Sequence, residues 1–250
     1  MANLVIDIGN SRTKLAVFNN REICHFEIHN LADEATIKRL LDRYSISGSV
    51  ISSVKDEISD LEAFLAGRTS YKRFSAATQG LINLSYRTPE TLGLDRLAGV
   101  IGARSLYPER NCLVIDAGTC ITYDAIDSDG NYNGGSISPG LAMRFKALHK
   151  LTGRLPFVSE DPDFNAGQGH DTTTSMISGV QNGIFYEVKG FIENYNLLYP
   201  DLQIILCGGD ANFFDTRLKN SIFAHAFKTE PHLVLIGLNE VIYPYNDQDF

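Results

Sequence analysis

Two segments of the chain pair a strand that ends in aspartate with a turn of small polar residues. They are Val5-Ile6-Asp7-Ile8-Gly9-Asn10 and Val114-Ile115-Asp116-Ala117-Gly118-Thr119. Such a turn exposes backbone N–H groups and hydroxyls to a phosphate, and its carboxylate can meet a metal ion or the ion's waters. An ordinary hairpin with an Asx turn is the alternative for either segment alone. Their repetition favours two loops that hold the phosphate tail of a nucleotide in a cleft between domains.

A third loop of small residues, Gly208-Gly209-Asp210, follows an apolar run. A purine and its ribose can lie against such a flat backbone surface, although a plain strand-to-helix turn remains the alternative. The chain contains neither G-x-x-x-x-G-K-[ST] nor G-x-G-x-x-G, so the loops are not a P-loop or a dinucleotide fingerprint.

Asp95 and Arg96 are neighbours in a segment with helical spacing. A carboxylate can accept the proton of a hydroxyl during phosphoryl transfer, and an arginine can clamp a substrate carboxylate. An Asp–Arg pair is also common on a solvated helix surface. The pattern alone does not decide between these two interpretations.

Strands and helices must position these residues, and the apolar spacing predicts both. Strands are expected at 4–7, 15–18, 24–28, 49–54, 112–116, 121–126, 132–138 and 203–207. Helices are expected at 32–44, 57–66, 88–105, 139–150, 172–198 and 234–242. The helix over 88–105 should begin with Thr88 as its cap and Pro89 in its first turn.

The order strand–turn–strand–turn–strand, followed by helices, occurs twice along the chain. It predicts two related α/β domains, 1–108 and 109–250, with the final helix free to pack back on the first domain.

The composition is that of a folded globular protein, with 44% hydrophobic residues in 250. Its 22 basic residues against 30 acidic ones give a net charge of −8, which argues against sequence-independent binding of nucleic acid. No apolar run is long enough to span a membrane, and residues 1–8 have no basic signal-peptide start. We therefore expect a cytoplasmic protein that binds neither nucleic acid nor membrane.

Cysteine and histidine spacing gives no indication of a zinc site. None of the four cysteines forms C-x-x-C. Among the six histidines only His25 and His29 have the H-x-x-x-H spacing, and they lie in a segment with the alternation of a strand and not on a predicted helix. We expect the cysteines to be buried, reduced thiols.

Five motifs in order along nearly the whole chain resemble those of type III pantothenate kinases. They are Asp7-Ile8-Gly9-Asn10-Ser11, Gly93-Leu94-Asp95-Arg96, Asp116-Ala117-Gly118-Thr119, Gly134-Gly135-Ser136-Ile137-x-Pro139-Gly140 and Gly208-Gly209-Asp210. The first motif alone would indicate only the wider superfamily of sugar kinases, acetate kinases and actin. The resemblance implies an α/β fold of two duplicated ribonuclease H-like domains of the actin-like ATPase superfamily. Each domain would be a mixed β-sheet with helices, and the two would surround a nucleotide cleft.

The resemblance also implies the reaction: phosphorylation of pantothenate by ATP to 4′-phosphopantothenate, the first step of coenzyme A biosynthesis. Asp95 would be the general base. The ATP-binding residues would be Asp7, Ile8, Gly9, Asn10, Ser11, Arg12, Thr13, Lys14 and Thr119. Asp7 would hold Mg²⁺ through water, and Asp116 would bind a monovalent cation, K⁺ or NH₄⁺.

The substrate-binding residues that the resemblance implies are Tyr86, Gly93, Leu94, Asp95, Arg96 and Thr172. Thr172 would reach the substrate of the partner subunit in a homodimer. The sequence departs from the family in Ser11, where threonine is commoner, and in Cys120, where alanine is usual. Ser11 keeps the hydroxyl, so phosphate contact is preserved.

Three other functions are compatible with parts of this pattern. One is another small-molecule kinase of the same superfamily, and a second is a nucleotide-binding regulator that has lost catalysis. The third is an actin-like filament protein, which the short chain disfavours. The Gly93-x-Asp95-Arg96 motif with Tyr86 upstream favours the pantothenate kinase.

Overall fold

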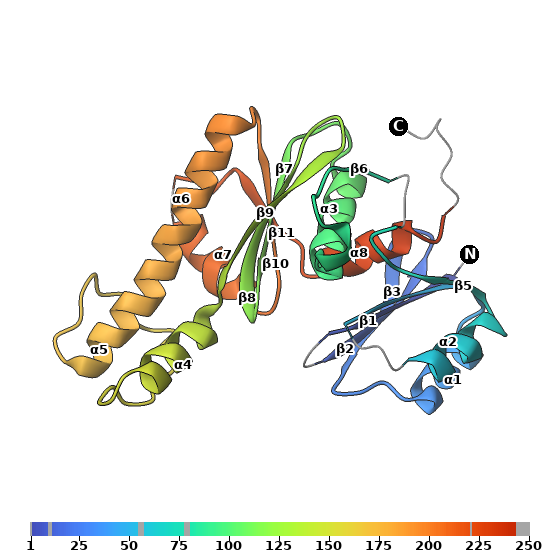
Figure 1. Cartoon of the computed structure of the whole chain (residues 1–250), viewed down its shortest axis with the longest axis horizontal. Helices are drawn as coiled ribbons and strands as arrows, with labels where there is room; N and C mark the ends of the chain where they lie inside the picture. Colours follow the sequence, from blue (N-terminus) through green and yellow to red (C-terminus); the bar gives the residue numbers. More distant parts are fainter. Residues whose placement is uncertain (1, 10–11, 55–57, 78–80, 221, 244–250) are drawn as a thin grey trace. The chain divides into compact units, whose positions relative to one another are not determined.

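The computed structural model describes residues 2–9, 12–54, 58–77, 81–220 and 222–243, which divide into two compact units (Figure 1). Unit 1 consists of the chain up to Pro108, Gly130–Tyr132 and the segment from His232 onward. Unit 2 consists of Glu109–Asp129 and Asn133–Pro231. The division of the sequence into duplicated domains 1–108 and 109–250 stays a prediction.

Unit 1 is built on a five-stranded sheet of order β3-β2-β1-β4-β5. Its strands are β1 (Ala2–Ile8), β2 (Thr13–Asn19), β3 (Glu22–His29), β4 (Ile46–Ser53) and β5 (Ser70–Arg73). β1, β2 and β3 form an antiparallel meander, while β4 joins β1 in parallel and β5 joins β4 in parallel. The sequence analysis predicted all of these strands except the short β5.

Two helices cover one face of this sheet, α1 (Glu34–Arg43) and α2 (Ser59–Ala66) (Figure 1). α1 begins at Asp33, whose carboxylate accepts a hydrogen bond of 2.8 Å from the Thr36 backbone N–H. Glu34 in the first turn and Arg43 in the last turn complement the helix dipole. Apolar side chains of these helices and of β1 and β2 form a core that includes Leu4, Ile6, Leu15, Val17, Ile37, Leu40, Phe64 and Leu65.

The helix expected over 88–105 starts later than predicted. Residues Pro89–Thr91 form a separate 3₁₀ turn, Leu92 and Gly93 are extended, and α3 runs over Leu94–Leu106. The Thr88 side chain caps neither element. Burial of Leu92 turns the chain between the two helical segments, so the expectation of one helix with a Thr88 cap was wrong. The consequence is that Asp95 lies in the first turn of α3.

The closing helix, α8 (Leu233–Glu240), packs on α3 at very short range. A Cβ atom on Gly237 would collide with the Ala98 carbonyl, and one on Gly102 would collide with the Leu233 carbonyl. Only glycine allows the two backbones to approach so closely. α8 therefore packs against α3 around Ala98 and Gly102, beyond the first turn that carries Asp95.

Replacing Gly237 with Ala is expected to lower the free energy of unfolding by about 3 kcal/mol, because the added methyl group has no space. Gly190→Ala is the matched control, since a Cβ there meets nothing within 4 Å and alanine favours a helix by about 0.5–1 kcal/mol. Urea unfolding of both variants measures the difference. Equal midpoints for the two variants would contradict this account of the α3–α8 contact.

The second sheet has the order β11-β10-β7-β8-β9-β6. Its strands are β6 (Asn83–Leu84), β7 (Cys112–Ala117), β8 (Cys120–Ile126), β9 (Asn131–Pro139), β10 (Gln203–Cys207) and β11 (Phe227–Thr229). β7 and β8 are antiparallel, and β10 lies parallel to β7 on its other side. The sequence analysis missed β6 and β11, both of which are three residues or shorter.

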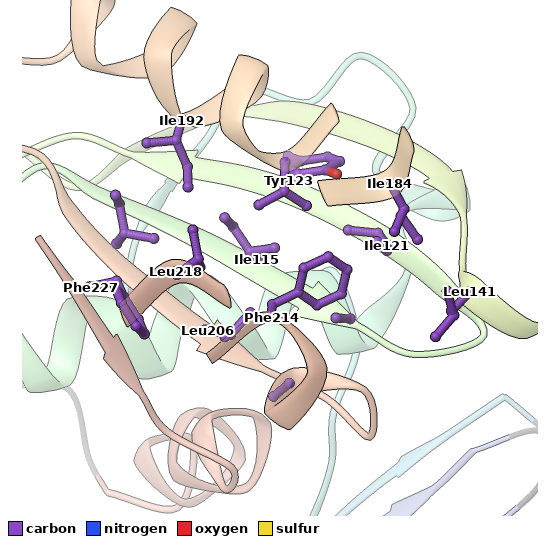
Figure 2. Close-up of a cluster of buried hydrophobic side chains, with 14 of the residues drawn as sticks. Ile115, Ile121, Tyr123, Leu141, Ile184, Ile192, Leu206, Phe214, Leu218 and Phe227 are labelled. Atoms are coloured by element: carbon purple, nitrogen blue, oxygen red, sulfur yellow. The ribbon is translucent and has the colours of Figure 1, made fainter. Parts of the chain in front are cut away.

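One face of this sheet is buried under helices of unit 2. Figure 2 shows the resulting core, in which Ile115 and Tyr123 point toward Phe214 and Ile184. Side chains alternate along a strand, so Asp116 and Thr122 lie on the face opposite to this core. The helices of unit 2 are α4 (Leu141–Leu151), α5 (Thr172–Ile177), α6 (Gly183–Leu198) and α7 (Ala211–Lys219), with a π-helical segment η2 (Ser178–Asn182).

The long helix expected over 172–198 is interrupted rather than regular. α5 and α6 are joined by the π-helical turn η2. α5 begins with a capping box, in which the Asp171 carboxylate accepts from the Thr174 N–H and the Thr174 hydroxyl accepts from the Asp171 N–H. The backbone N–H of His170 donates to the same hydroxyl at 2.9 Å, which gives the His170 backbone a structural role.

The expectation that the cysteines are buried holds for Cys112 and Cys207 but not for Cys24, which is exposed. Cys24 lies on β3, an outer strand of its sheet, where side chains have neighbours on fewer sides. Cys120 is partly exposed, and none of the four cysteines forms a disulfide bond. Within the described residues, no helix has the length and apolar character that a membrane crossing needs.

Candidate active site

Asp7 lies near the carboxyl end of β1, between two strands that carry polar residues. It is opposite Lys14 of β2 and opposite Ser52 of β4. The N–H of Gly9 donates to the Arg12 carbonyl at 3.0 Å and closes the turn between β1 and β2. This turn is the predicted phosphate loop, although Asn10 and Ser11 lie outside the described residues.

The other predicted members of this loop differ in exposure. Ile8 and Thr13 are buried, Gly9 and Lys14 are partly buried, and the Arg12 side chain is exposed. Ile8 belongs to the apolar core of unit 1, so its side chain is structural and only its backbone is available to a ligand.

The Asp7 carboxyl group is held in an unfavourable environment for a negative charge. Its pKa is raised from 3.8 to about 6. Burial is the main cause, the positive charge of Lys14 opposes the rise, and the negative charge of Asp95 adds to it. The fold of unit 1 thus brings Asp7 and Asp95, 88 positions apart in sequence, within electrostatic reach. Two acidic groups placed near each other in this way are typical of a site that binds a cation or moves a proton.

Asp95 stands exposed in the first turn of α3. Its Oδ1 accepts a hydrogen bond of 2.8 Å from the Arg96 N–H. A Cβ atom on Gly93 would lie 2.6 Å from that oxygen, so a side chain at this position would displace the carboxylate. Gly93 therefore leaves room for the Asp95 carboxylate at the start of the helix.

Arg96 is buried and faces Tyr86. The central carbon of its guanidinium group lies 5.8 Å from the centroid of the Tyr86 ring. Leu94, which directly precedes Asp95, is partly exposed. Five residues predicted to contact the substrate, Tyr86, Gly93, Leu94, Asp95 and Arg96, are thus grouped around the first turn of α3.

In unit 2, three loops meet around the end of β7. The Gly118 N–H donates to the Cys120 carbonyl at 2.9 Å, and the Gly140 N–H donates to the Thr119 carbonyl at 3.1 Å. The Asp210 N–H donates to the Ala117 carbonyl at 2.8 Å. The residues after Asp116 are therefore fixed by hydrogen bonds to the loops before α4 and before α7.

Two glycines make this close approach possible. A Cβ on Gly140 would lie 2.6 Å from the Thr119 carbonyl oxygen and would collide with that of Gly118. Gly208 has φ +93°, and its Cβ would collide with the Ala117 carbonyl and the Asp116 carboxylate. Thr119 itself is exposed at the tip of the loop, where its backbone and hydroxyl are open to a ligand.

Arg144 of α4 holds the turn that leads into Gly140, a role that the sequence analysis did not detect. Its guanidinium group donates to the Pro139 carbonyl at 2.8 Å and to the Ser138 hydroxyl at 2.9 Å. It also forms an ion pair of 2.5 Å with Glu187 of α6, which accepts a hydrogen bond of 3.0 Å from Tyr123. The signal in the sequence is weak, because these residues are far apart and only the fold brings them together.

A cavity of about 270 Å³ lies beside the loop before α7. Apolar side chains of Leu141, Phe145 and Phe157 line it, together with Lys146, Glu160 and Asp210. Burial and the nearby Glu160 raise the pKa of Asp210. The cavity combines apolar walls with a few polar groups, as a site for a small ligand does.

Thr172 lines a different cavity from the one beside Asp210. It is the first residue of α5 and lines a separate cavity of about 850 Å³ with residues of α4, α5 and η2. Leu148, Leu151, Met176 and Val180 make most of the wall of this second cavity apolar.

The class to which this structure belongs by its fold is that of the actin-like ATPases and sugar kinases. The structure resembles glucokinase from an Antarctic psychrotroph, with a TM-score of 0.55 and 11% identity over 96% of this chain and 98% of that one. It also resembles the activator of 2-hydroxyisocaproyl-CoA dehydratase from Clostridium difficile, solved with bound ADPNP, with a TM-score of 0.54 and 11% identity over 97% and 93% of the two chains. These likenesses confirm the predicted fold class.

Sequence comparison identifies the family within that class. The family model of type III pantothenate kinase matches residues 3–194. A type III pantothenate kinase of Phocaeicola vulgatus is 42% identical over 248 residues, covering 98% of this chain and 99% of the relative. The chain belongs to the type III pantothenate kinase family, as the five motifs predicted.

Proposed function

We propose that this chain transfers the γ-phosphoryl group of ATP to the hydroxyl group of pantothenate, which yields 4′-phosphopantothenate and begins coenzyme A biosynthesis. Membership of the family supports the substrate. The observation that carries the proposal within the molecule is the grouping of Asp95, Arg96 and Tyr86 around the first turn of α3, within electrostatic reach of Asp7. This grouping supplies a proton acceptor and a cationic anchor beside a candidate metal-binding carboxylate.

Asp95 is the proposed general base, because its carboxylate is exposed and held at the helix start by the Arg96 N–H. As the hydroxyl attacks the γ-phosphorus, the carboxylate takes the hydroxyl proton and the bond to the leaving ADP oxygen breaks. Arg96 is proposed to clamp the substrate carboxylate, with Tyr86, Gly93 and Leu94 as the remaining walls. Most of the rate gain would come from positioning and charge stabilisation.

ATP is proposed to lie along the small-residue loops. The loop from Asp7 to Lys14, Asn10 and Ser11 included, would bind phosphate oxygens through its N–H groups, hydroxyls and the Lys14 ammonium. Thr119 would contact the nucleotide from the loop after β7. The nucleoside end is proposed to lie in the cavity of about 270 Å³ beside Asp210, against its apolar side chains.

Two cations complete the proposal, Mg²⁺ at Asp7 and K⁺ or NH₄⁺ at Asp116. Among the described residues, no group of three or more His, Cys, Asp or Glu side chains gathers to hold a metal ion directly. A single carboxylate at each site suits a hydrated Mg²⁺, which keeps several waters, and a large monovalent ion, which accepts hydroxyl and carbonyl oxygens. When bound, these ions would offset the charge of the triphosphate.

We also propose that the protein is a cytoplasmic homodimer in which Thr172 completes the partner's substrate site. The support is the apolar wall of the cavity that Thr172 lines, because side chains such as the exposed Leu151 gain from being covered. Sedimentation velocity at micromolar concentration measures the assembly state directly, and a monomer would contradict this part of the proposal.

An ADP-release assay tests the reaction. It contains ATP, Mg²⁺ and K⁺, with and without pantothenate, and is repeated with Na⁺ in place of K⁺. Pantothenate-dependent turnover that falls without K⁺ is the expected result. ATP binding without pantothenate-dependent turnover would instead favour another acceptor or a regulator that has lost catalysis.

A further inference from the structure

The hydroxyl of Thr122 has an unusual environment. Its Oγ1 is buried and has no hydrogen-bond partner within the described part of the chain. Buried polar groups are almost always paired, and one without a protein partner often faces a bound ion or water. Thr122 lies on β8, a strand that neither the sequence motifs nor the proposed reaction uses.

The register of the sheet places this hydroxyl beside Asp116. Thr122 and Asp116 are directly opposite in the antiparallel pair of β8 and β7. Side chains directly opposite in such a pair are on the same face, with Cβ atoms about 5 Å apart. Both side chains lie on the face away from the apolar core, and the Thr122 hydroxyl makes no hydrogen bond to the Asp116 carboxylate.

On its other side, Asp116 lies against the end of β10 and the residue that follows it. Cys207 of β10 is opposite it in the parallel pair, and Gly208 follows in the left-handed region at φ +93°. Because a Cβ on Gly208 would collide with Asp116 Oδ1, the carboxylate lies directly against the Gly208 backbone. The carboxylate is thus confined on the β10 side, while an unsatisfied hydroxyl stands on the β8 side.

We propose that Thr122 Oγ1 is a second protein ligand of the monovalent cation at Asp116. This rests on the proposed function, which assigns that cation to Asp116. A carboxylate and a neutral hydroxyl about one strand spacing apart offer two oxygens to a large, weakly hydrated ion such as K⁺. The hydroxyl lone pairs, which no donor among the described residues occupies, would face the ion.

Thermal unfolding without substrates tests this directly. The wild type is titrated with KCl, and tetramethylammonium chloride keeps the ionic strength constant. A bound ion stabilises only the folded chain, so Tm rises with K⁺ and the midpoint reports its affinity. Thr122→Val removes the hydroxyl with almost no change of shape, and its midpoint should move to at least about 10-fold higher K⁺.

Two comparisons separate ion binding from a structural role. Without K⁺, Thr122→Val should be at least as stable as the wild type, because an unsatisfied buried hydroxyl has been removed. Thr122→Ser should restore the wild-type K⁺ midpoint. If Thr122→Val does not fold, the K⁺ midpoints of Thr122→Ala and Thr122→Ser are compared instead. Thr122→Ala should then need at least about 10-fold more K⁺ than Thr122→Ser.

The outcomes distinguish this inference from the proposed function. An unchanged K⁺ midpoint in Thr122→Val, or no K⁺ effect on the wild type, would overturn the inference. If Asp116→Asn loses the K⁺ effect while Thr122→Val keeps it, Asp116 stays the cation site and only Thr122 is excluded. If Asp116→Asn keeps the effect, the cation lies elsewhere, whereas the kinase reaction itself is decided by the ADP-release assay.

Discussion

Asp95→Asn is expected to lower kcat for pantothenate phosphorylation by about 10³-fold, within the range for loss of a general base. Asparagine has nearly the same shape, and its side-chain oxygen can still accept the 2.8 Å hydrogen bond from the Arg96 N–H. The start of α3 and the position of Arg96 should therefore persist. Single-turnover ADP release measures the chemical step, and calorimetric titration with ATP should give an unchanged Kd.

Asp60→Asn is the matched control for this variant. Like Asp95, Asp60 is an exposed carboxylate in the first turn of a helix of unit 1, here α2. Asp60 belongs to none of the predicted site motifs. Its loss should leave kcat unchanged. Turnover by Asp95→Asn within a few-fold of the wild type would show that another group accepts the proton.

Asp7→Asn is expected to change stability and activity in opposite directions. Burial raises the Asp7 pKa from 3.8 to about 6, so the ionised group opposes folding at neutral pH by about 3 kcal/mol at most. The neutral amide removes this penalty, and the free energy of unfolding should rise. Activity should fall by about 100-fold, because an amide does not attract the waters of Mg²⁺ as a carboxylate does.

The pH dependence of the free energy of unfolding follows from the raised pKa of Asp7. The folded chain binds a proton at Asp7 more tightly than the unfolded chain, so wild-type stability falls as pH rises from about 4 to about 6. Above pH 6 the full penalty is present. In Asp7→Asn this contribution to the slope disappears, which urea unfolding at pH 4.5 and pH 7.5 can measure.

Activity should show the complementary profile. The wild type should lose kcat/KM for MgATP as pH falls below about 6, because Asp7 becomes protonated. Asp60→Asn should retain both the wild-type stability slope and the wild-type activity profile. Two results would contradict this account of the Asp7 charge. One is a free energy of unfolding of Asp7→Asn that is lower than that of the wild type at pH 7.5. The other is a loss of kcat/KM at low pH that occurs at the same pH in Asp95→Asn as in the wild type, because removal of the Asp95 charge should lower the pKa of Asp7.

Much of the fold could be predicted because periodic apolar residues and turn residues are local signals. The runs around Leu4, Leu15, Leu113 and Ile205 became inner strands of the two sheets, and the helix predicted over 32–44 became α1. The fold class and the family were predicted from the resemblance of five short motifs to those of a known family. Some of these motifs contain glycines that are required where two backbones approach closely, as at Gly140 and Gly208.

Local signals failed where burial overrode them. Thr88 and Pro89 form a favourable helix start in sequence, yet burial of Leu92 breaks the chain and the helix begins at Leu94. Cys24 lies in a segment that was correctly predicted as a strand, yet it is exposed because this strand is at the edge of its sheet. The short strands β5, β6 and β11 carry too few residues to show a period.

The sequence by itself determined the family, the residue types of the candidate site and the strands that end in Asp7 and Asp116. Only the tertiary structure decided how those residues act on one another. The raised pKa of Asp7, the clamp of Arg144 on the Pro139 turn and the unpaired hydroxyl of Thr122 beside Asp116 each depend on partners from different elements. Burial and charge interactions depend on distance in space, and sequence spacing does not encode that distance for residues on separate strands and helices.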